Sequence, residues 1–258
     1  MFSHLTLFGS SLLIGCACAW GQLNITRSPY NAMIGAGAGG LAVCSSGLRG
    51  IGQTNTTTGS MVYVVATSNV PPANALMLCS VACGMSGGPP IPTLAGHGTT
   101  WVLIATTNWG NYRICLFRSL TNNTPTSTPI VATFGSTLWG CNMRATFWTN
   151  VNTSGTWGSG AIVQSVMVTN NTANPSVTLA ALNGSTNAVY CAFVNDVNGY
   201  GATSIDAGWT QDIQNGFNVT ATGQCNIYAV ETSDNTPSIT DGAQAWGGIA
   251  VEIQKACP

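Results

Sequence analysis

The sequence predicts an all-β protein, an antiparallel β-sandwich of jelly-roll or Greek-key type with a Gly-rich N-terminal arm. Three observations lead to this fold class. Beyond residue 60, hydrophobic and polar side chains alternate with a period of about two, which is typical of β-strands. Clusters of Asn, Gly, Pro and Thr separate these segments and are typical of turns. No stretch has the periodicity of an amphipathic helix, so the helical crossovers that join parallel strands are not expected.

The composition is that of a folded chain with a neutral surface. The 258 residues are 45% hydrophobic and carry a formal net charge of -1, whereas disordered chains combine low hydrophobicity with high charge. Charged residues make up only 5%, against roughly 25% in an average globular protein. Asn, Thr, Ser and Gly therefore supply the surface polarity. The chain is long enough to bury a core without disulfide or metal support.

Two segments are predicted from the change in composition. Residues 1–60 form a Gly-rich arm or lead-in, and residues 61–258 form the β-sandwich domain. Residues 1–21 are a candidate export signal, because residues 5–19 are largely apolar and end in Ala-Cys-Ala, which resembles a cleavage site. The apolar stretch is shorter than the roughly 20 residues of a membrane-spanning helix, so no membrane span is predicted.

The opening segment has two interpretations. Residues 13–16 also match the motif that precedes a lipidated cysteine, with Cys16 as the acylated residue. However, no Lys or Arg occurs before Arg27 and Gly9 interrupts the apolar stretch, whereas export signals begin with a basic region. A retained segment that a large assembly covers is the favoured expectation, and a cleaved signal is the alternative.

The predicted strands follow the alternation along the chain. They are residues 61–67, 75–83, 101–107, 112–119, 142–149, 161–169, 176–182, 188–194, 224–232 and 248–254. Within 112–119, two sets of side chains point to opposite faces of the sheet: Tyr112, Ile114 and Leu116 on one, and Arg113, Cys115 and Phe117 on the other. This pattern predicts strands that are buried on one face.

The charges are segregated along the sequence. No Asp or Glu occurs before Asp196, and all seven acidic residues lie in the last quarter of the chain. The basic residues before Asp196 are Arg27, Arg49, Arg113, Arg118 and Arg144. These arginines are too sparse to neutralise a phosphate backbone, so nucleic acid is not an expected partner. Head-to-tail contact between copies of the chain is compatible with this charge distribution.

Two short motifs match catalytic or cofactor patterns in letters only. Residues 84–88, GMSGG, fit the pattern that exposes a nucleophilic serine, here Ser86, with His97 as the nearest histidine along the chain. Prolines follow at once and prevent the helix that this motif requires, so a loop is expected. Residues 35–40, GAGAGG, lack the acidic residue about 20 positions downstream that a dinucleotide site uses. No enzymatic activity and no cofactor are predicted.

The ten cysteines leave two interpretations open. Cys79 and Cys83 lie on one predicted strand about 13 Å apart, which is too far for a disulfide between them. Cys115 and Cys191 also lie among apolar neighbours, where a thiol behaves as a small hydrophobic side chain. Buried thiols are the favoured expectation, and a partial set of disulfides in an exported protein is the alternative.

Two further sets of residues are candidate binding groups. Asp196, Asn198 and Asp206 surround a Gly-rich turn and are weak candidates for calcium ligands, although the EF-hand spacing is broken. Trp109, Trp157 and Trp209 lie near Gly, Asn or Thr residues and are candidates for stacking on glycans; filling the sandwich core is the alternative role for tryptophan.

Several phrases resemble jelly-roll β-sandwich proteins of tailed-phage structural genes and of bacterial exported proteins. The resemblance covers about residues 60–255 and rests on "SMVYVVAT", "ANALMLCSVAC", "YRICLFRS", "AGWTQDI" and "AWGGIAVEIQ". It implies a structural component of a bacteriophage virion, such as a decoration, fibre or tail-associated subunit. Its expected partners are copies of itself and other virion proteins, and its expected location is a virion assembled in the host cytoplasm. The alternative is a secreted or cell-surface adhesion module that binds host-surface glycans.

Overall fold

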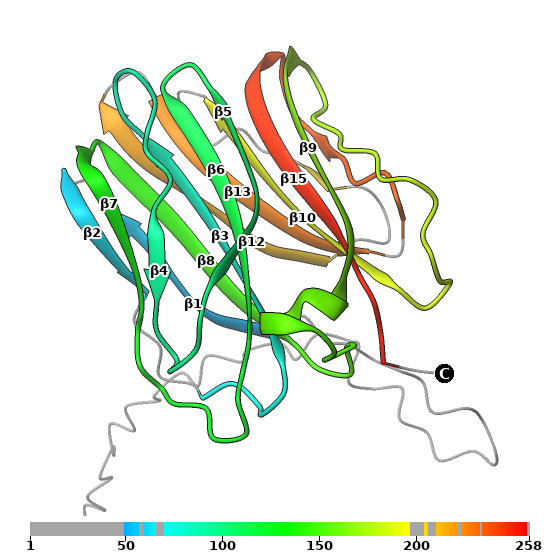
Figure 1. Cartoon of the computed structure of the whole chain (residues 1–258). Coiled ribbons are helices and arrows are strands. Elements are labelled where there is room, and N and C mark those ends of the chain that lie inside the picture. Colours follow the sequence, from blue (N-terminus) through cyan, green and yellow to red (C-terminus); the bar gives the residue numbers. More distant parts are fainter. Residues whose placement is uncertain are drawn as a thin grey trace, which may run out of the picture. The chain divides into compact units, whose positions relative to one another are not determined.

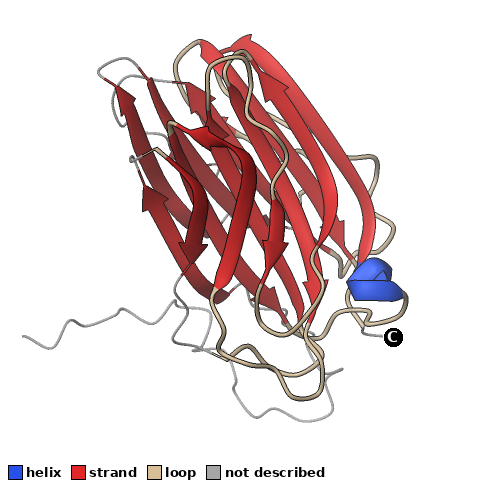
Figure 2. Ribbon diagram, turned by 60° about the vertical axis from the view of Figure 1, so that its left-hand side comes forward, coloured by secondary structure: helices blue, strands red, loops and turns tan. Residues whose placement is uncertain are grey.

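A computed structural model describes residues 49–56, 59–65, 70–196, 204–205, 210–220, 223–232 and 234–256, with side-chain environments for 59–65, 70–195 and 234–256. These residues all belong to one compact unit, Val43–Pro258. The described chain is almost entirely β-structure in antiparallel sheets, with one short 3-10 helix (Figures 1 and 2). The all-β sandwich prediction is confirmed.

The elements in chain order are β1 (Arg49–Thr56), β2 (Ser60–Val65), β3 (Leu76–Gly84), β4 (Thr93–Ala95), β5 (Val102–Trp109), β6 (Tyr112–Leu120), β7 (Ile130–Leu138), β8 (Gly140–Trp148), η2 (Thr156–Ala161), β9 (Ile162–Thr172), β10 (Ala188–Asp196), β11 (Ser204–Ile205), β12 (Thr210–Thr220), β13 (Gly223–Thr232), β14 (Ile239–Thr240) and β15 (Gln244–Ile253).

The predicted strands are present with one exception. Residues 176–182 form no strand beyond an isolated bridge between Ser176 and Ser238, although Val177 and Leu179 of this segment are buried. The alternation does not mark β7 and β12, where Gly, Ser, Thr and Asn weaken the hydrophobic pattern. β1 lies within the predicted lead-in, but it pairs with β8 along its length.

The first half of the chain has a jelly-roll arrangement. One main sheet has the order β1-β8-β3-β6-β5, and a three-stranded outer sheet has the order β2-β7-β4. The first strand thus pairs with the eighth, the second with the seventh and the third with the sixth, as in a long hairpin wound into a double sheet. We call β1–β8 the first repeat, and its two sheets the first main sheet and the first outer sheet.

The second half repeats this strand order. The second main sheet has the order β12-β13-β10-β15-β9. Read from its opposite edge, the first main sheet has the order β5-β6-β3-β8-β1, so β9 corresponds to β1 and β10 corresponds to β3. The outer layer also corresponds: β14 pairs with β11, and the segment around Ser176 bridges to Ser238 beside β14. Residues 162–253 are therefore a second jelly-roll repeat.

Strand register supports this correspondence residue by residue. In the first repeat, Cys79 of β3 lies opposite Phe117 of β6 and Ala145 of β8. In the second repeat, Cys191 of β10 lies opposite one residue of β13 and opposite Ala250 of β15. The central strands of the two repeats thus occupy equivalent places, and they are related by an offset of 112 positions.

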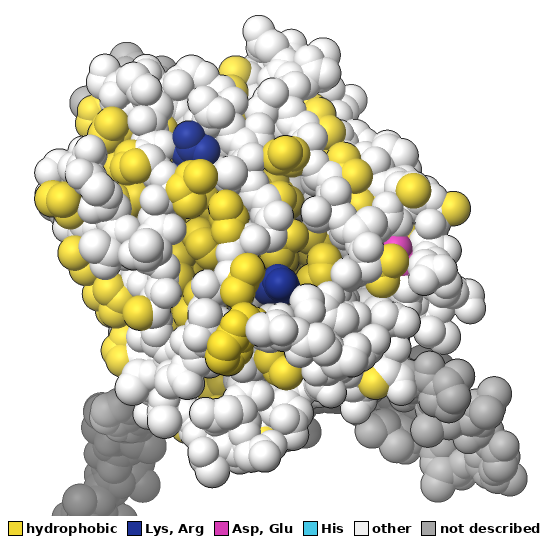
Figure 3. Space-filling model, viewed as in Figure 1, with side chains coloured by type: hydrophobic (Ala, Val, Ile, Leu, Met, Phe, Trp, Pro, Cys, Tyr) yellow, Lys and Arg dark blue, Asp and Glu magenta, His cyan; other side chains and the backbone are white. Residues whose placement is uncertain are grey.

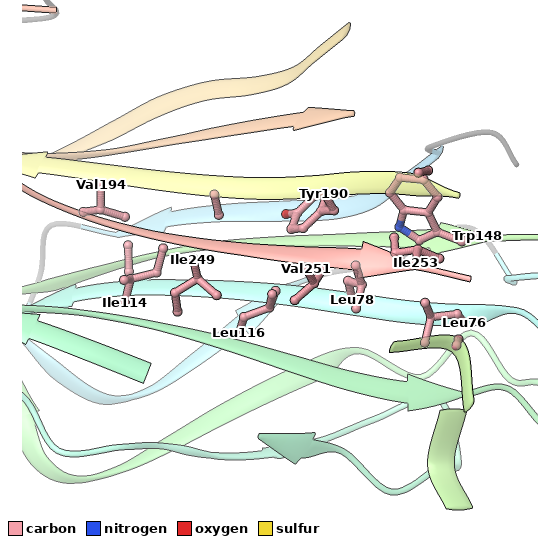
Figure 4. Close-up of a cluster of buried hydrophobic side chains, with 14 of the residues drawn as sticks. Leu76, Leu78, Ile114, Leu116, Trp148, Tyr190, Val194, Ile249, Val251 and Ile253 are labelled. Atoms are coloured by element: carbon pink, nitrogen blue, oxygen red, sulfur yellow. The ribbon is translucent and has the colours of Figure 1, made fainter. Parts of the chain in front are cut away.

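The two main sheets pack face to face. Figure 4 shows the side chains between them: Leu76, Leu78, Ile114 and Leu116 come from the first repeat, and Tyr190, Val194, Ile249, Val251 and Ile253 come from the second. We call this cluster the inter-repeat core. Each fully buried aliphatic side chain of this size contributes about 1.5–3 kcal/mol to folding, so the repeats hold together as one block.

A close contact of Trp109 with Gly247 belongs to this packing. The Trp109 ring packs against the inter-repeat core from the end of β5, and a β-carbon at Gly247 would lie 2.2 Å from its Cζ3 atom. Only glycine allows the indole to approach the β15 backbone this closely. Trp109 also stacks with Tyr112 at a ring-centroid distance of 6.2 Å.

The first main sheet is buried on both faces. Residues of β3 that point away from the inter-repeat core pack with the first outer sheet in a second cluster, the first outer core, which includes Met77, Cys79, Val81, Phe117 and Phe134. All nine residues of β3 are buried. The alternation predicted for 112–119 is confirmed, but the prediction of one buried face is wrong, because the outer sheet covers the other face.

The second main sheet is covered differently on its outer face. Val177 and Leu179 from an irregular segment, together with Ile239 of β14, pack on Phe193 and Trp246 in a third cluster, the second outer core. Beside it, the fully buried Glu252 accepts hydrogen bonds from the Asn183 backbone N–H, Asn187 Nδ2 and Gln164 Nε2 at 2.7, 2.5 and 2.6 Å. Three donors satisfy this carboxylate, and they fasten the segment before β10 to the sheet.

Candidate functional site

Arg118 lies on the face of the first main sheet that forms the inter-repeat core. It is opposite Leu78 of β3 and Val102 of β5 in the antiparallel register, and Leu78 is a member of that core. Residues directly opposite each other point to the same face. The guanidinium therefore leaves the sheet on the side of the second repeat, close to the edge strand β5.

The Arg118 guanidinium is only partly compensated. Its side chain is half-buried, and within the described part of the chain its Nε is a buried atom without a hydrogen-bond partner. Burial lowers the pKa of Arg118 below its ordinary value. By contrast, Arg113, on the other face of β6, donates to the Pro89 carbonyl at 2.6 Å and to Thr106 Oγ1 at 3.1 Å. Arg118 is thus equipped to bind an oxyanion.

The strand β5, which pairs with the Arg118 strand, lies beside β9, and part of the edge that these two strands form is exposed to solvent. Met167 and Ser165 of β9 pair with Ile249 and Val251, two residues of the inter-repeat core, so they sit on the core-facing side of the second main sheet. Nevertheless Met167 is 55% exposed, and Ser165 is also exposed. In Figure 3, hydrophobic side chains gather over this part of the surface with basic groups set among them. We call it the β5–β9 edge.

A rigid loop beside this edge presents Trp157. The indole is 44% exposed, and Trp157 has a φ of 54°, in the left-handed region that bulky residues rarely occupy. Hydrogen bonds from Gly160 N to the Ser154 carbonyl and from Thr156 N to Ser159 Oγ hold the loop. Strained residues of this kind cluster at binding sites, because the surrounding structure must impose the conformation.

Gly158 fixes this loop to the sandwich. It is buried with a φ of 79°, and a β-carbon there would lie 3.0 Å from Leu76 Cδ1 and 3.6 Å from Leu120 Cβ. Leu120 is two residues beyond Arg118 on the same face of β6. The Trp157 loop therefore adjoins the strand segment that carries Arg118.

A second surface feature lies on β2, at the other end of the fold. β2 is an edge strand of the first outer sheet, and it carries three exposed hydrophobic side chains, Met61, Val62 and Val64. Val62 and Val64 pair with Thr133 and Val131 of β7, so the exposed face continues with uncharged, mostly β-branched residues. Natural proteins usually protect such an edge with charges or proline.

The predicted glycan-contact tryptophans are in three different situations. Trp157 is exposed in the loop described above. Trp109 is half-buried and packs on the inter-repeat core, which corresponds to the core-filling alternative. Trp209 lies outside the described residues.

The weak calcium candidates cannot be assembled into a site from the described chain. Asn198 and Asp206 lie outside the described residues, and Asp196 ends β10 without a described side chain. Among the described residues, no group of three or more His, Cys, Asp or Glu side chains is arranged to hold a metal ion.

Ser86 and His97 lie at opposite ends of the first main sheet. Ser86 is exposed in the turn after the Gly84 end of β3. His97 is fully buried, and its Nδ1 lies 2.6 Å from the Thr126 carbonyl; it neighbours Thr99, which bonds to the Leu120 carbonyl beside the other end of β3. The two ends of β3 are eight residue steps apart, which is about 26 Å. Ser86 and His97 therefore form no catalytic dyad.

The described cysteines with known environments are buried thiols that form no disulfide: Cys79, Cys83, Cys115, Cys141 and Cys191. For these residues the buried-thiol interpretation is confirmed. Burial raises the pKa of Cys115 to about 11 and that of Cys79 further still. Cysteines so far from ionisation are poor nucleophiles and act as packing residues.

The comparisons with known proteins give no relative. No family model matches the sequence, and no curated protein or solved structure matches it. The described residues include no helix that is long and apolar enough to span a membrane. The physical features of the molecule must therefore carry any functional conclusion.

Proposed function

We propose that this protein is a self-associating structural subunit of a bacteriophage virion, such as a decoration, fibre or tail-associated component. The observation that carries the proposal is the β2 edge, which exposes Met61, Val62 and Val64 and, among the described strands, pairs on one side only. A strand edge of this kind pairs or packs with another chain. An assembly that covers this edge buries its hydrophobic side chains and can pair its backbone N–H and C=O groups.

The architecture of the block supports this role. Two repeats share one core, and the central strands β3 and β10 are buried on both faces in their described residues, so the block can transmit contact forces without internal rearrangement. The surface is neutral and rich in hydroxyl and amide groups, which allows copies to approach without strong repulsion. The resemblance to tailed-phage structural proteins supplies the virion context.

Sedimentation of the purified full chain tests self-association. We expect species larger than one chain that grow with protein concentration. Val64→Lys should reduce them at least ten-fold, because it places a charge on the β2 edge, whereas Asn123→Lys on an exposed loop should leave them unchanged. A wild-type chain that stays monomeric at all concentrations would contradict the proposal. Mass spectrometry of purified particles adds the virion test: the chain should be present and begin at Met1.

A second candidate function is an exported adhesion module that binds surface glycans. The exposed Trp157 in its strained, hydrogen-bonded loop favours it, since aromatic faces stack on sugars. A glycan array with wild type and Trp157→Ala decides between the two. Binding that the variant loses, together with an N-terminus near Gln22, would support the adhesion module and contradict the virion subunit.

A further inference from the structure

We propose that Arg118 is an oxyanion-binding residue at an interface between copies of this chain, where the β5–β9 edge of one copy receives a carboxylate from the second repeat of its neighbour. This inference rests on the proposed self-association and adds to it a second contact, on a different surface from the β2 edge. The occupant is a second copy, and the chemistry is a guanidinium–carboxylate pair.

The first step is the state of Arg118 within one chain. A half-buried guanidinium with an unpaired, buried Nε has lost hydration without a compensating hydrogen bond. Such a group lowers the stability of the fold unless a ligand supplies the missing hydrogen-bond acceptor. The apolar Val102 lies directly opposite Arg118 on β5, and an apolar neighbour strengthens the attraction for an anion that enters.

The second step is the source of the anion. The first repeat, residues 49–148, contains four arginines and no acidic residue, so it holds no carboxylate for Arg118. The second repeat, residues 162–253, contains all seven acidic residues and no basic one. The two repeats of neighbouring copies are therefore complementary in charge, whereas two first repeats or two second repeats repel each other.

The third step concerns which carboxylates are committed within their own chain. Glu252 is buried with three hydrogen-bond donors, and Asp241 accepts hydrogen bonds from the Asn195 and Gln244 side chains and from the Gly242 backbone N–H. Asp234 also accepts a hydrogen bond, from the Thr236 backbone N–H at 2.9 Å, but it is exposed. Exposure at the surface makes Asp234 the described example of an acid of the second repeat that another copy can reach.

The fourth step is the geometry of the resulting contact. It joins the β5–β9 edge of one copy to a different surface of the next, so the interface is heterologous. Repetition of a heterologous contact builds a ring or a filament instead of a closed two-fold dimer. Both are suitable for a fibre, a tail or a decorated shell.

Carbodiimide cross-linking of an Arg118→Lys variant tests the contact directly. The reagent joins an amine to a carboxylate that touches it, and a mixture of isotopically light and heavy full-length chains distinguishes links between copies from links within one. We expect light-to-heavy links from position 118 to an acidic residue within 162–258. Arg113→Lys, on the opposite face of β6 with its partners inside the chain, is the matched control and should give none. Links from position 118 only within one chain would overturn the proposal.

An Arg118→Met variant supplies the second measurement. Methionine keeps the packing of the stem and removes the charge, so the folded chain should keep its thermal stability while its self-association weakens at least ten-fold. If wild type and Arg118→Met assemble equally, this inference fails while the proposed function stands. If wild type does not assemble at all, both fail.

Inorganic phosphate separates a free anion from a neighbouring chain. We expect phosphate to dissociate the wild-type assembly more strongly than chloride does at equal ionic strength, because it competes for Arg118. If phosphate instead binds a wild-type monomer, raises its melting temperature and has no effect on Arg118→Met, the site takes a free anion and the contact between copies is contradicted.

Discussion

The two repeats have the same strand order but differ in how they are completed. In the first repeat, a regular three-stranded sheet covers the outer face of the main sheet. In the second, irregular segments and the two-stranded pair β11–β14 take that place. Strand pairing and period-two alternation are therefore sufficient to form the main sheet twice, whereas two different structures can cover its outer face.

Equivalent positions show how far the solutions diverge. Phe147 of β8 and Glu252 of β15 each lie opposite matching residues of the central strands, Met77 and Val189. The first repeat fills this place with a hydrophobic side chain at the edge of its outer core, and the second fills it with a buried carboxylate that binds Asn and Gln donors. The same difference extends to charge, because arginines belong to the first repeat and acids to the second.

The largest expected effect comes from the contact that joins the repeats. Gly247→Ala should destabilise the protein by about 3 kcal/mol, because the new methyl group overlaps the Trp109 ring. Gly242→Ala is the matched control, since a β-carbon there meets nothing within 4 Å. Urea unfolding measures both. If the two variants are equally stable, the close packing of Trp109 on Gly247 between the repeats is contradicted.

The next effect concerns the polar solution of the second repeat. Glu252→Gln replaces a carboxylate oxygen with an amide donor, which then faces the Asn183 and Asn187 donors. We expect a loss of about 1–3 kcal/mol in the free energy of unfolding. Phe147→Leu at the equivalent place should cost less than about 1.5 kcal/mol, because it keeps the hydrophobic packing. An unchanged stability of Glu252→Gln would show that the carboxylate does not hold the segment.

Alkaline pH should weaken the protein, because burial raises the pKa of thiols and of a tyrosine. Burial raises the pKa of Cys115 from 9.0 to about 11, and that of Tyr63 from 10.0 to about 12. The unfolded chain therefore loses these protons first, so stability is complete below pH 9 and falls as the pH rises towards 11 and 12. Each group contributes at most about 1.4 kcal/mol per pH unit. Cys115→Ala should reduce the slope between pH 9 and 11; an unchanged slope would contradict burial of this thiol.

The smallest effect is expected at the loop between the repeats. Trp157→Gly removes a bulky residue from the left-handed region, and the gain of about 1 kcal/mol from relieved strain offsets the greater flexibility of glycine in the unfolded chain. We expect a change in melting temperature of at most a few degrees. A large loss of stability would show that the indole packs on the sandwich instead of being presented to a partner.

Much of the fold could be predicted from the sequence, because each central strand carries its own alternation. The pattern of 112–119 predicted correctly which side chains share a face of the strand, but it predicted burial of only one of the two buried faces. Strands with weak alternation, such as β7 with its Gly135, were missed because their position depends on pairing with neighbours. The repeated strand order was also missed, since the equivalent strands 76–84 and 188–196 share one aligned cysteine and no other identical residue.

The candidate site was harder to predict. Arg118 occupies a core-facing position of an alternating strand in a region without acids, and that combination is the signal that marks it. Its significance depends on the second repeat packing over β6 and on the open β5–β9 edge, and both result from pairings between residues far apart in the sequence. Trp157 was named as a candidate from its polar neighbours, but the strain that distinguishes it from Trp109 is a property of the folded loop.

An electron cryo-microscopy reconstruction of the protein assembled from purified wild-type chains tests the central claim most directly. Each copy should appear as two face-to-face jelly-roll repeats, with the first repeat of one copy against the second repeat of the next around Arg118. A reconstruction in which equivalent repeats meet across a two-fold axis, or in which Arg118 faces solvent at every contact, would contradict the account.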